Sequence, residues 1–379
     1  MLAATTQLTT YVPPGSARGH GPVELVVARR PDALASIGWD ECPGASPFLS
    51  ARWLAAFAAA GGPATQYLLF RDRAGVLGKA LEQRLPVARM RLGRVPSGLV
   101  SAVFGPELRQ FGQALFSGPH GAHFADSGRG LELLEAARAA RAERRGPASW
   151  LVKDLPIGPA QLPGWTSITA LPDMTVPIDR AWSSEADYLA ALPSKYRRRA
   201  RRARRLFASL SVRKLAAHEA DELSPDLDAL YGDLLRRSPY VPWRAPAGYV
   251  ARLRRAGGDG CELRGYFDGE VLVGFSTLLF AGGEALAHLA AVDEGYNASH
   301  QLYLNLLFDL LAAAIAGGAE RLSLGRTATT IKSSLGARPA ELVSYATHDG
   351  RLRRRLFGAL NAGALSSGDL GAPVRRPFG

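Results

Sequence analysis

The sequence predicts an α/β (α+β) protein of two domains, in which helices flank mixed sheets. Its 379 residues are too many for one ordinary hydrophobic core and suit two domains of typical size. Glu262–Asp268 and Val271–Phe280 alternate like strands around the turn pair Asp268-Gly269, which is a strong hairpin signal. Further along, His300–Ala316 has the apolar pattern of a long helix, and the short strand Arg321–Leu324 follows it. Strands and helices are therefore expected to mix within one domain.

The first half of the chain has the same mixture of elements. The patterns predict strands at Val23–Val27, Tyr67–Arg71, Lys79–Met90 and Ser149–Lys153, and helices at Pro47–Ala60 and Leu131–Arg145. Prolines at positions 156, 159 and 163 indicate a linker. We therefore expect a flexible leader over residues 1–20, a first domain over 21–160, a second domain over 161–363 and a flexible tail over 364–379.

The second domain is predicted to begin with a strand at Met174–Ile178. Ser183-Ser184-Glu185 has the composition of a helix cap with an acidic first turn. Pro193 is expected to kink or split the helix that follows, because proline cannot donate the hydrogen bond of a helix interior. A basic helix over 194–210 comes next, and apolar residues at helical spacing give it one face that packs on the domain. The hairpin is followed by a third strand, Ala285–Val292.

Most of the net positive charge lies in one segment. Ser194–Arg205 contains eight basic residues, and without them the net charge would fall from +12 to +4. Such a concentration indicates a local anionic partner. For Arg197–Arg205 three interpretations stay open: a solvated face without a partner, RNA, and an anionic membrane surface or phosphorylated substrate. The face lacks the aromatic residues on which single strands stack. A second basic amphipathic run, Arg351–Arg355, favours the membrane surface unless it is a helix packed on the core.

Composition excludes several other classes of protein. The two cysteines, Cys42 and Cys261, are far apart and make no disulfide framework, which favours the cytoplasm. No apolar run reaches the roughly 18 residues of a spanning helix, and Met1–Gly15 lacks the pattern of a signal peptide. His120 and His123 form a His-x-x-His pair, but no cysteine or carboxylate accompanies them at ligand spacing. We therefore expect no metal site and assign both histidines to a loop that lines the cleft, with a surface loop of no role as the alternative.

A polar elbow, Asp293–Ser299, separates the third strand from the long helix. A helix that starts directly after a strand points its free backbone N–H groups and its positive dipole end at the elbow. Such an elbow suits a phosphate or another anion. Asn297 and Ser299 are expected to cap the helix. The alternative is an ordinary connection between strand and helix that binds nothing.

Three stretches of the second half carry a resemblance to a known family: Tyr266–Phe275, Leu322–Arg326 and Lys332–Gly336. Their order and spacing resemble the second half of a tandem acyltransferase of the GNAT superfamily, in its FemAB/CelD-like (peptidoglycan biosynthesis/recognition) branch. The run Pro47-Phe-Leu-Ser also resembles the start of that group. The resemblance implies two GNAT-like domains, each with a mixed, mostly antiparallel central sheet. The elbow departs from the family, because it lacks the usual Gln/Arg-x-x-Gly-x-Gly/Ala phosphate loop.

The resemblance also implies a reaction in which an amine displaces the thiol of a thioester. The predicted catalytic residues are His288, whose ordinary pKa suits a general base, Glu294 as a second base, and Tyr303 as the donor of a proton to sulfur. A core histidine with a satisfied hydrogen bond is the alternative for His288. His300, expected at the start of the long helix, would be kept neutral by the helix dipole. The predicted contacts of coenzyme A are Ser299, His300, Gln301, Arg326 and Lys332, and those of the acceptor are Tyr240, Trp243, His120 and His123.

These features predict an N-acyltransferase that uses acyl-CoA as co-substrate and a hydrophobic amine as acceptor. Bacterial ceramide synthases resemble tandem acyltransferases of this branch, so the resemblance implies a sphingoid base as acceptor and a peripheral place on the inner face of the membrane. A Fem-like transferase that uses aminoacyl-tRNA on a cell-envelope precursor is the first alternative. A catalytically inactive module that binds acyl-CoA is the second.

Overall fold

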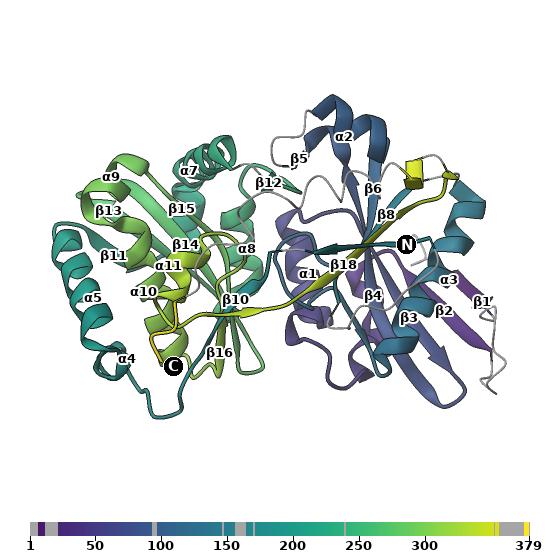
Figure 1. Cartoon of the computed structure of the whole chain (residues 1–379), viewed down its shortest axis with the longest axis horizontal. Coiled ribbons are helices and arrows are strands. Elements are labelled where there is room, and N and C mark those ends of the chain that lie inside the picture. Colours follow the sequence, from purple (N-terminus) through teal and green to yellow (C-terminus); the bar gives the residue numbers. More distant parts are fainter. Residues whose placement is uncertain are drawn as a thin grey trace.

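The computed structural model describes residues 7–11, 22–92, 97–145, 148–155, 164–169, 171–238, 240–351, 353–355 and 375–378. Two sheets lie side by side, and helices flank each of them (Figure 1). Most neighbouring strands in both sheets run antiparallel. The structure therefore confirms the predicted α/β class with two mixed, mostly antiparallel sheets.

The first sheet has the strand order β1-β2-β3-β4-β6-β8-β18-β9, and β7 pairs with β4 beside this path. Its parallel pair is β6 with β8. The strands are β1 (Gln7–Tyr11), β2 (Val23–Ala28), β3 (Thr65–Asp72), β4 (Gly75–Pro86), β6 (Glu107–Phe111), β7 (Ala122–Phe124), β8 (Ser149–Leu155), β9 (Thr166–Thr169) and β18 (Val343–His348). The strands predicted in the first half are all confirmed, within a few residues at their ends.

Three helices accompany the first sheet: α1 (Ala51–Ala60), α2 (Ser97–Phe104) and α3 (Ser127–Arg145). Helix α1 confirms the prediction, and Gly61 ends it in the left-handed conformation. Helix α3 is also confirmed, and its apolar side packs in one core with Phe111 and Trp150 of the sheet. Short 3₁₀ turns lie at Pro31–Ala33, Ala35–Ile37, Trp39–Glu41, Pro47–Leu49 and Val87–Arg89.

The second sheet has the strand order β11-β13-β14-β15-β16-β10-β17. Its strands are β10 (Asp173–Pro177), β11 (Ser211–Lys214), β13 (Cys261–Asp268), β14 (Val271–Ala281), β15 (Glu284–Val292), β16 (Arg321–Ser323) and β17 (Arg338–Ala340). The helices of this half are α4 (Glu185–Ala191), α5 (Ser194–Phe207), α6 (Ala217–Glu222), α7 (Ser224–Arg237), α8 (Tyr249–Gly257), α9 (Glu294–His300), α10 (Leu302–Ala316) and α11 (Thr329–Ser333), with a 3₁₀ turn at Gly258–Gly260. A separate small sheet pairs β5 (Arg91–Leu92) with β12 (Tyr240–Val241).

Local signals placed several of these elements correctly. Strands β13 and β14 pair from Asp268 with Val271, so Gly269 and Glu270 form the two-residue loop of the predicted hairpin. Gly269 has a φ of +55°, which suits glycine at the first loop position. Ser184 accepts a hydrogen bond from the Asp187 backbone and caps α4 as predicted. Pro193 lies between α4 and α5, so the split that it predicts is also confirmed.

The long helix differs from its prediction at its start. Gln301 has a φ of +49° and separates α9 from α10, so the polar elbow is itself a short helix. Asp293 caps α9 through the backbone N–H groups of Gly295 and Tyr296. Asn297 accepts from the Tyr303 backbone N–H at 3.0 Å and so supports the start of α10, as expected. The cap predicted for Ser299 is wrong, because its hydroxyl donates to the Gly295 carbonyl inside α9.

The chain does not divide between the two sheets at a single point. Strands β9 and β18 both follow residue 160 and both belong to the first sheet, where β18 pairs with β8 and β9. The segment from β17 to β18 crosses from the second sheet to the first (Figure 1). Sequence patterns did not predict this return, and the domain boundaries proposed above stay a prediction.

One hydrophobic core joins the two halves of the chain. Trp53 and Phe57 of α1 pack with Leu253 of α8, and the same core includes Phe275 and Leu279 of β14. An apolar core shared in this way holds the two sheets in one arrangement. Among the described residues, no helix combines the length and the apolar character that crossing a bilayer requires.

Candidate functional site

The parallel strands β15 and β16 stop pairing soon after they begin. Their pairing covers Glu284–Leu286 of β15, whereas Ala287 and Ala290–Val292 pair with β14 alone, and His288 and Leu289 lie where the register shifts. A β-bulge lies on β15 at this point, and the Thr277 hydroxyl holds it by bonding the Leu289 N–H at 2.8 Å and the Leu289 carbonyl at 3.0 Å. We call the free edge of His288–Val292 the strand split. Backbone groups on this edge are available to a ligand.

His288 lies at the start of the strand split. Its Nε2 shares a hydrogen bond of 2.9 Å with the Tyr249 hydroxyl, and its buried Nδ1 has no partner among the described residues. Burial lowers the pKa of His288 to about 3. The imidazole is therefore neutral near pH 7, which corrects the expectation that its ordinary pKa serves a general base. The hydrogen bond to Tyr249 also fits the alternative of a core histidine with a satisfied hydrogen bond, so that alternative stays open.

A loop of the first half forms a wall beside His288. The Phe116 ring meets the imidazole edge-on at 5.8 Å between centroids, and it also contacts His120 at 5.4 Å. His120 is buried, bonds the Ser46 hydroxyl at 2.6 Å, and has its pKa lowered by burial to about 4. His120 therefore lies near the strand split, as predicted, with Phe116 between it and His288. His123 is on β7 opposite Lys79 and beside the Pro43 backbone, so it does not join this group.

The acceptor residues predicted from the aromatic loop 238–243 are placed only in part. Trp243 meets the Tyr249 ring edge-on at 5.4 Å, and Tyr249 in turn meets His288 at 5.7 Å. Trp243, Tyr249, His288 and Phe116 therefore form one chain of ring contacts, which we call the aromatic chain. Tyr240 belongs to β12, but its side chain lies outside the described residues.

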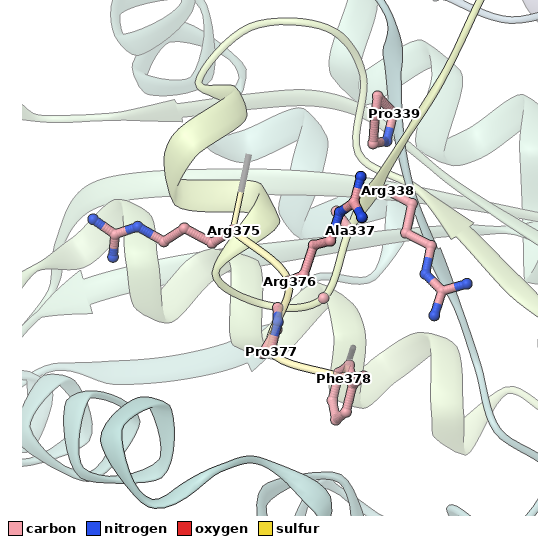
Figure 2. A pocket seen from close by; sticks show the side chains of 8 residues that line it. Ala337, Arg338, Pro339, Arg375, Arg376, Pro377 and Phe378 are labelled. Atoms are coloured by element: carbon pink, nitrogen blue, oxygen red, sulfur yellow. The ribbon is translucent and has the colours of Figure 1, made fainter. Parts of the chain in front are cut away.

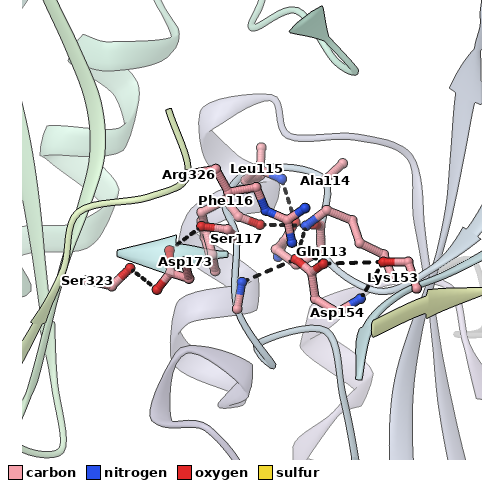
Figure 3. A network of polar contacts seen from close by, with 12 residues as sticks. Gln113, Ala114, Leu115, Phe116, Ser117, Lys153, Asp154, Asp173, Ser323 and Arg326 are labelled. Carbon is pink, nitrogen blue, oxygen red and sulfur yellow. Dashed lines mark hydrogen bonds and ion pairs between the residues drawn. The ribbon is translucent and has the colours of Figure 1, made fainter. Parts of the chain in front are cut away.

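A buried polar network joins the two sheets next to this group (Figure 3). Asp154, at the end of β8, accepts from Lys153 at 2.7 Å and from the Gly118 N–H at 3.2 Å, and it pairs with Arg326 from the loop after β16. Burial alone would raise the pKa of Asp154, but Lys153 and Arg326 hold it below its ordinary value. The Arg326 guanidinium is therefore paired with Asp154 of the first sheet. It does not lie at an open surface where a phosphate would bind it, as the sequence predicted.

A second carboxylate extends this network into the second sheet. Asp173 of β10 accepts from Ser117 at 2.5 Å and from Ser323 at 2.7 Å (Figure 3). Lys332 is 3% exposed and donates to the Gly325 carbonyl at 3.2 Å. Burial lowers the pKa of Lys332 to about 8, and the charge of Asp173 opposes that shift. Lys332 is therefore a buried amine that can lose its proton near neutral pH, not a surface charge.

The residues predicted around the elbow lie mostly at the surface. Glu294 is exposed and pairs with Arg237 at 3.1 Å. His300 is the last residue of α9, bonded to Ser299 at 2.7 Å, which corrects its expected place at a helix start. Tyr303 is partly buried in the first turn of α10, where burial raises its pKa to about 12. Among the backbone N–H groups expected to bind an anion here, those of Gly295 and Tyr296 bond Asp293, and that of Tyr303 bonds Asn297.

Four residues of the site were not singled out from the sequence: Phe116, Tyr249, Asp154 and Asp173. The pair Lys153-Asp154 at the end of an apolar strand is a signal that was available, because adjacent charges rarely follow a buried strand without partners. Phe116 and Tyr249 carry no such signal, since apolar and aromatic residues are common in both segments. Their roles depend on contacts between residues far apart in the chain.

The second half of the chain is similar to a known enzyme family. Residues 194–333 match the family described as acetyltransferase (GNAT) domain. This match covers less than half of the chain and shows that these residues are similar to a transferase domain of the GNAT superfamily. None of the curated protein sequences matches the chain.

Solved structures show the same fold over most of the chain. The crystal structure of FemX has a TM-score of 0.52 and 11% identity over 84% of this chain and 95% of its own. A tandem GNAT protein from the clavulanic acid biosynthesis pathway has a TM-score of 0.49 and 15% identity over 86% of this chain and 99% of its own. At these identities the likenesses concern the fold alone.

Proposed function

We propose that this protein transfers an acyl group from acyl-CoA to the amine of a hydrophobic acceptor, at the strand split. The observation that carries the proposal is the short β15–β16 pairing beside His288, whose unpaired Nδ1 is the free polar group there. A thioester lying along the free edge of β15 finds backbone hydrogen-bond donors for its carbonyl oxygen. The GNAT match over residues 194–333 supports the same location.

The chemistry requires few groups. The amine nitrogen attacks the thioester carbonyl carbon, a C–N bond forms, the C–S bond breaks, and the amine proton passes to the departing sulfur. A neutral His288 orients the amine by accepting its N–H at Nδ1, while its Nε2–H points to the Tyr249 oxygen. Tyr303 stays protonated at neutral pH because of its raised pKa, so it remains our candidate to pass this proton on: its hydroxyl donates to the sulfur and takes up the proton that the amine loses. Glu294 is exposed and forms an ion pair with Arg237, so this proposal gives it no role as a base.

The contacts of coenzyme A also belong to the proposal. Lys332 is our main candidate for a polar contact with the donor, because it has one hydrogen bond among the described residues and a neighbouring carboxylate. Ser299, His300 and Gln301 lie at the joint between α9 and α10 and can contact the phosphates from the surface. Arg326 is the weakest of the predicted contacts because Asp154 already holds it.

The lining of the site supports an apolar acceptor. Phe116, Trp243 and Tyr249 present rings, and Leu289 is partly buried in the same core. A long-chain amine such as a sphingoid base suits these groups, because its tail packs on rings while its amine reaches His288. His120 is a further proposed part of this wall.

The test is turnover by the purified full chain. The protein is incubated with acyl-CoA of several chain lengths and with a panel of amines that includes a sphingoid base, and the amide product and released thiol are measured by mass spectrometry. Formation of an amide with long-chain amines supports the proposal. Binding of acyl-CoA without turnover over the whole panel would instead identify an inactive binding module.

A second candidate function rests on the exposed face of α5. Lys195, Arg198 and Arg202 are exposed, whereas Arg204 turns inward to Asp309 and Glu185, each at 2.7 Å. A row of exposed cations favours a nucleic-acid phosphate backbone, as a transferase that uses aminoacyl-tRNA would require. Binding of tRNA that weakens steeply with salt, together with amide formation from charged tRNA but not from acyl-CoA, would favour this candidate.

The same face supports a proposed place at an anionic membrane surface. Leu206 is 40% exposed beside these cations, which gives α5 an apolar contact as well as charge. The run Arg351–Arg355, of which 351 and 353–355 are described, would add to it. Substituting Arg198→Gln and Arg202→Gln should weaken binding to anionic vesicles by about 1 kcal/mol for each charge. Equal vesicle binding by the variant would remove the membrane from the proposal.

A further inference from the structure

A small pocket lies away from the strand split, between the turn after α11 and the C-terminal segment Arg375–Phe378 (Figure 2). Its volume is about 310 Å³. The turn contributes Gly336 and Ala337, the start of β17 contributes Arg338 and Pro339, and the C-terminal segment contributes Arg375 and Arg376. None of the described residues that line it is acidic. Such a lining is unusual because basic side chains on a protein surface are ordinarily interspersed with acidic ones.

The pocket is a built feature, because the C-terminal segment is anchored. The Phe378 ring contacts Trp182 at 5.5 Å and Tyr188 at 6.1 Å between centroids. Gly336 has a φ of +88°, and a Cβ there would come within 2.4 Å of the Phe378 ring, so this close approach requires glycine. The Arg375 N–H donates to the Ser333 hydroxyl at 3.0 Å. The backbone of the segment is therefore held by contacts that do not involve its arginine side chains.

The guanidinium groups of the pocket are unpaired. Arg338, Arg375 and Arg376 are exposed, and their side chains have no ion pair or hydrogen bond within the described parts of the chain. Burial and the nearby Arg375 charge lower the pKa of Arg199 on α5. Arg199 thus adds a fourth positive charge to the same neighbourhood. These four positive charges lie close together, so they repel one another more than charges spread over a surface do, unless an anion lies between them.

The geometry indicates which kind of anion fits. Arg376 runs along Ala337 towards Pro339, while Arg375 and Arg338 point to opposite sides of it (Figure 2). The cations therefore form an arc and do not converge on one point. A diphosphate spreads its charge over two centres, and each phosphate accepts paired hydrogen bonds from a guanidinium fork. From this arrangement we propose that the pocket binds the diphosphate or phosphate-ester group of a ligand, separately from the acyl-transfer site.

The experiment measures binding of inorganic pyrophosphate to the full chain by calorimetry in about 0.15 M NaCl. We expect one site, which Arg338→Gln with Arg376→Gln weakens about tenfold or more. The matched control is Arg29→Gln with Arg73→Gln, which removes the same charge from exposed positions of the first sheet and should change affinity by less than about twofold. Pyrophosphate should also raise the unfolding midpoint of the wild type and the control, but not that of the pocket variant.

A second arm separates the two sources of such a group. Vesicles of phosphatidylcholine are compared with vesicles that also contain phosphatidic acid. If only phosphatidic acid vesicles bind, and the pocket variant loses that binding, the ligand is a lipid headgroup. If free pyrophosphate binds and depends on the same arginines, it is a free phosphate compound. Pyrophosphate affinity that is equal in wild type and pocket variant, or absence of binding to both probes, overturns the proposal.

Discussion

The two sheets each contain one parallel strand pair, and the two pairs end differently. In the first sheet β6 pairs with β8 from Leu108 to Phe111, and the loop that follows fills the space beyond. Lys153 donates to the Gln113 and Phe116 carbonyls, both at 2.8 Å. In the second sheet β15 leaves β16 after Leu286, and shortly beyond that point the buried Nδ1 of His288 has no partner among the described residues. One parallel pair is closed by its own loop and the other is open.

This difference indicates a division of labour between the halves. The loop that closes the first pair continues to Phe116 and Ser117, which contact His288 and Asp173 of the second sheet. The loop of the first half therefore packs against its own parallel pair and also forms a wall beside the strand split of the second sheet. Such an arrangement requires the two halves to keep a fixed relation, which the shared core and the buried Asp154 network provide.

The largest effect is expected from breaking the polar network that closes the first pair. Asp154→Asn leaves Lys153 and Arg326 buried without a counter-charge, which should lower the free energy of unfolding by about 3–5 kcal/mol. Urea unfolding measures this loss. The matched control is Asp32→Asn, which breaks the exposed pair with Arg30 and should cost about 0–1 kcal/mol. Equal losses in both variants would contradict the closing role of Asp154.

The same carboxylate predicts a pH dependence. Because the folded pKa of Asp154 is below its ordinary value of about 3.9, its contribution is complete above that pH and is lost as the pH falls through the folded pKa. Wild type should therefore lose more stability than Asp154→Asn on acidification below about pH 4. Parallel stability curves for the two proteins would show that the pairing does not depress this pKa.

The second largest effect is expected from removing the His288 imidazole at the strand split. His288→Gln should lower kcat/KM for amide formation about 100-fold, because the amine loses its orienting acceptor. His218→Gln, an exposed change on α6, is the control and should leave the rate unchanged. Since the pKa of His288 is about 3, the wild-type rate should show no histidine inflection between about pH 5 and 8. An inflection near pH 6.5 that the variant abolishes would show a general base after all.

A smaller effect is expected from the bulge that separates β15 from β16. Thr277→Val leaves the Leu289 N–H and carbonyl without their partner, at a cost of about 1–3 kcal/mol of stability. If the bulge keeps the pair open, KM for acyl-CoA should also rise. Thr347→Val removes a comparable buried hydrogen bond, to Gly164 at 2.6 Å, in the first sheet. That control should lose stability without any change in KM, and a rise in both would point to a general loss of packing.

Sequence patterns predicted the elements whose causes are local. The Asp268-Gly269 hairpin, the Ser184 cap and the split at Pro193 each depend on residues that are close together in the chain, and all three were correct. The return of β18 was not predictable in this way, because its partner β8 lies almost 200 residues earlier and no local signal connects them. The break at Gln301 was also missed, since an apolar helix pattern continues through it.

The candidate site divides along the same line. His288 is a candidate from the sequence because its strand is expected to line the cleft and its ordinary pKa suits a general base. The neutral state of His288 was not predictable from the sequence. Its pKa depends on burial created by Phe116 and Tyr249, which come from other parts of the chain. Arg326 was taken for a phosphate contact on its position after a strand, and its partner Asp154 comes from the other sheet. Contacts between residues of the two halves could not be predicted, because no local sequence pattern indicates them.

The smallest effect is expected from removing one oxygen atom, the hydroxyl of Tyr249 that bonds His288. Tyr249→Phe removes the hydrogen bond to Nε2 of His288 and keeps the ring contacts, so a net loss of about 0.5–1.5 kcal/mol is expected, or roughly three- to tenfold in kcat. Tyr188→Phe is the matched control, because it removes a buried hydroxyl that donates to the Leu335 carbonyl at 3.2 Å, away from the strand split. If Tyr249 fixes the tautomer that leaves Nδ1 free to accept the amine, kcat falls in the first variant only, with no shift of the pH profile. A loss of stability alone, the same in both variants, would mean that the hydroxyl only fills the core.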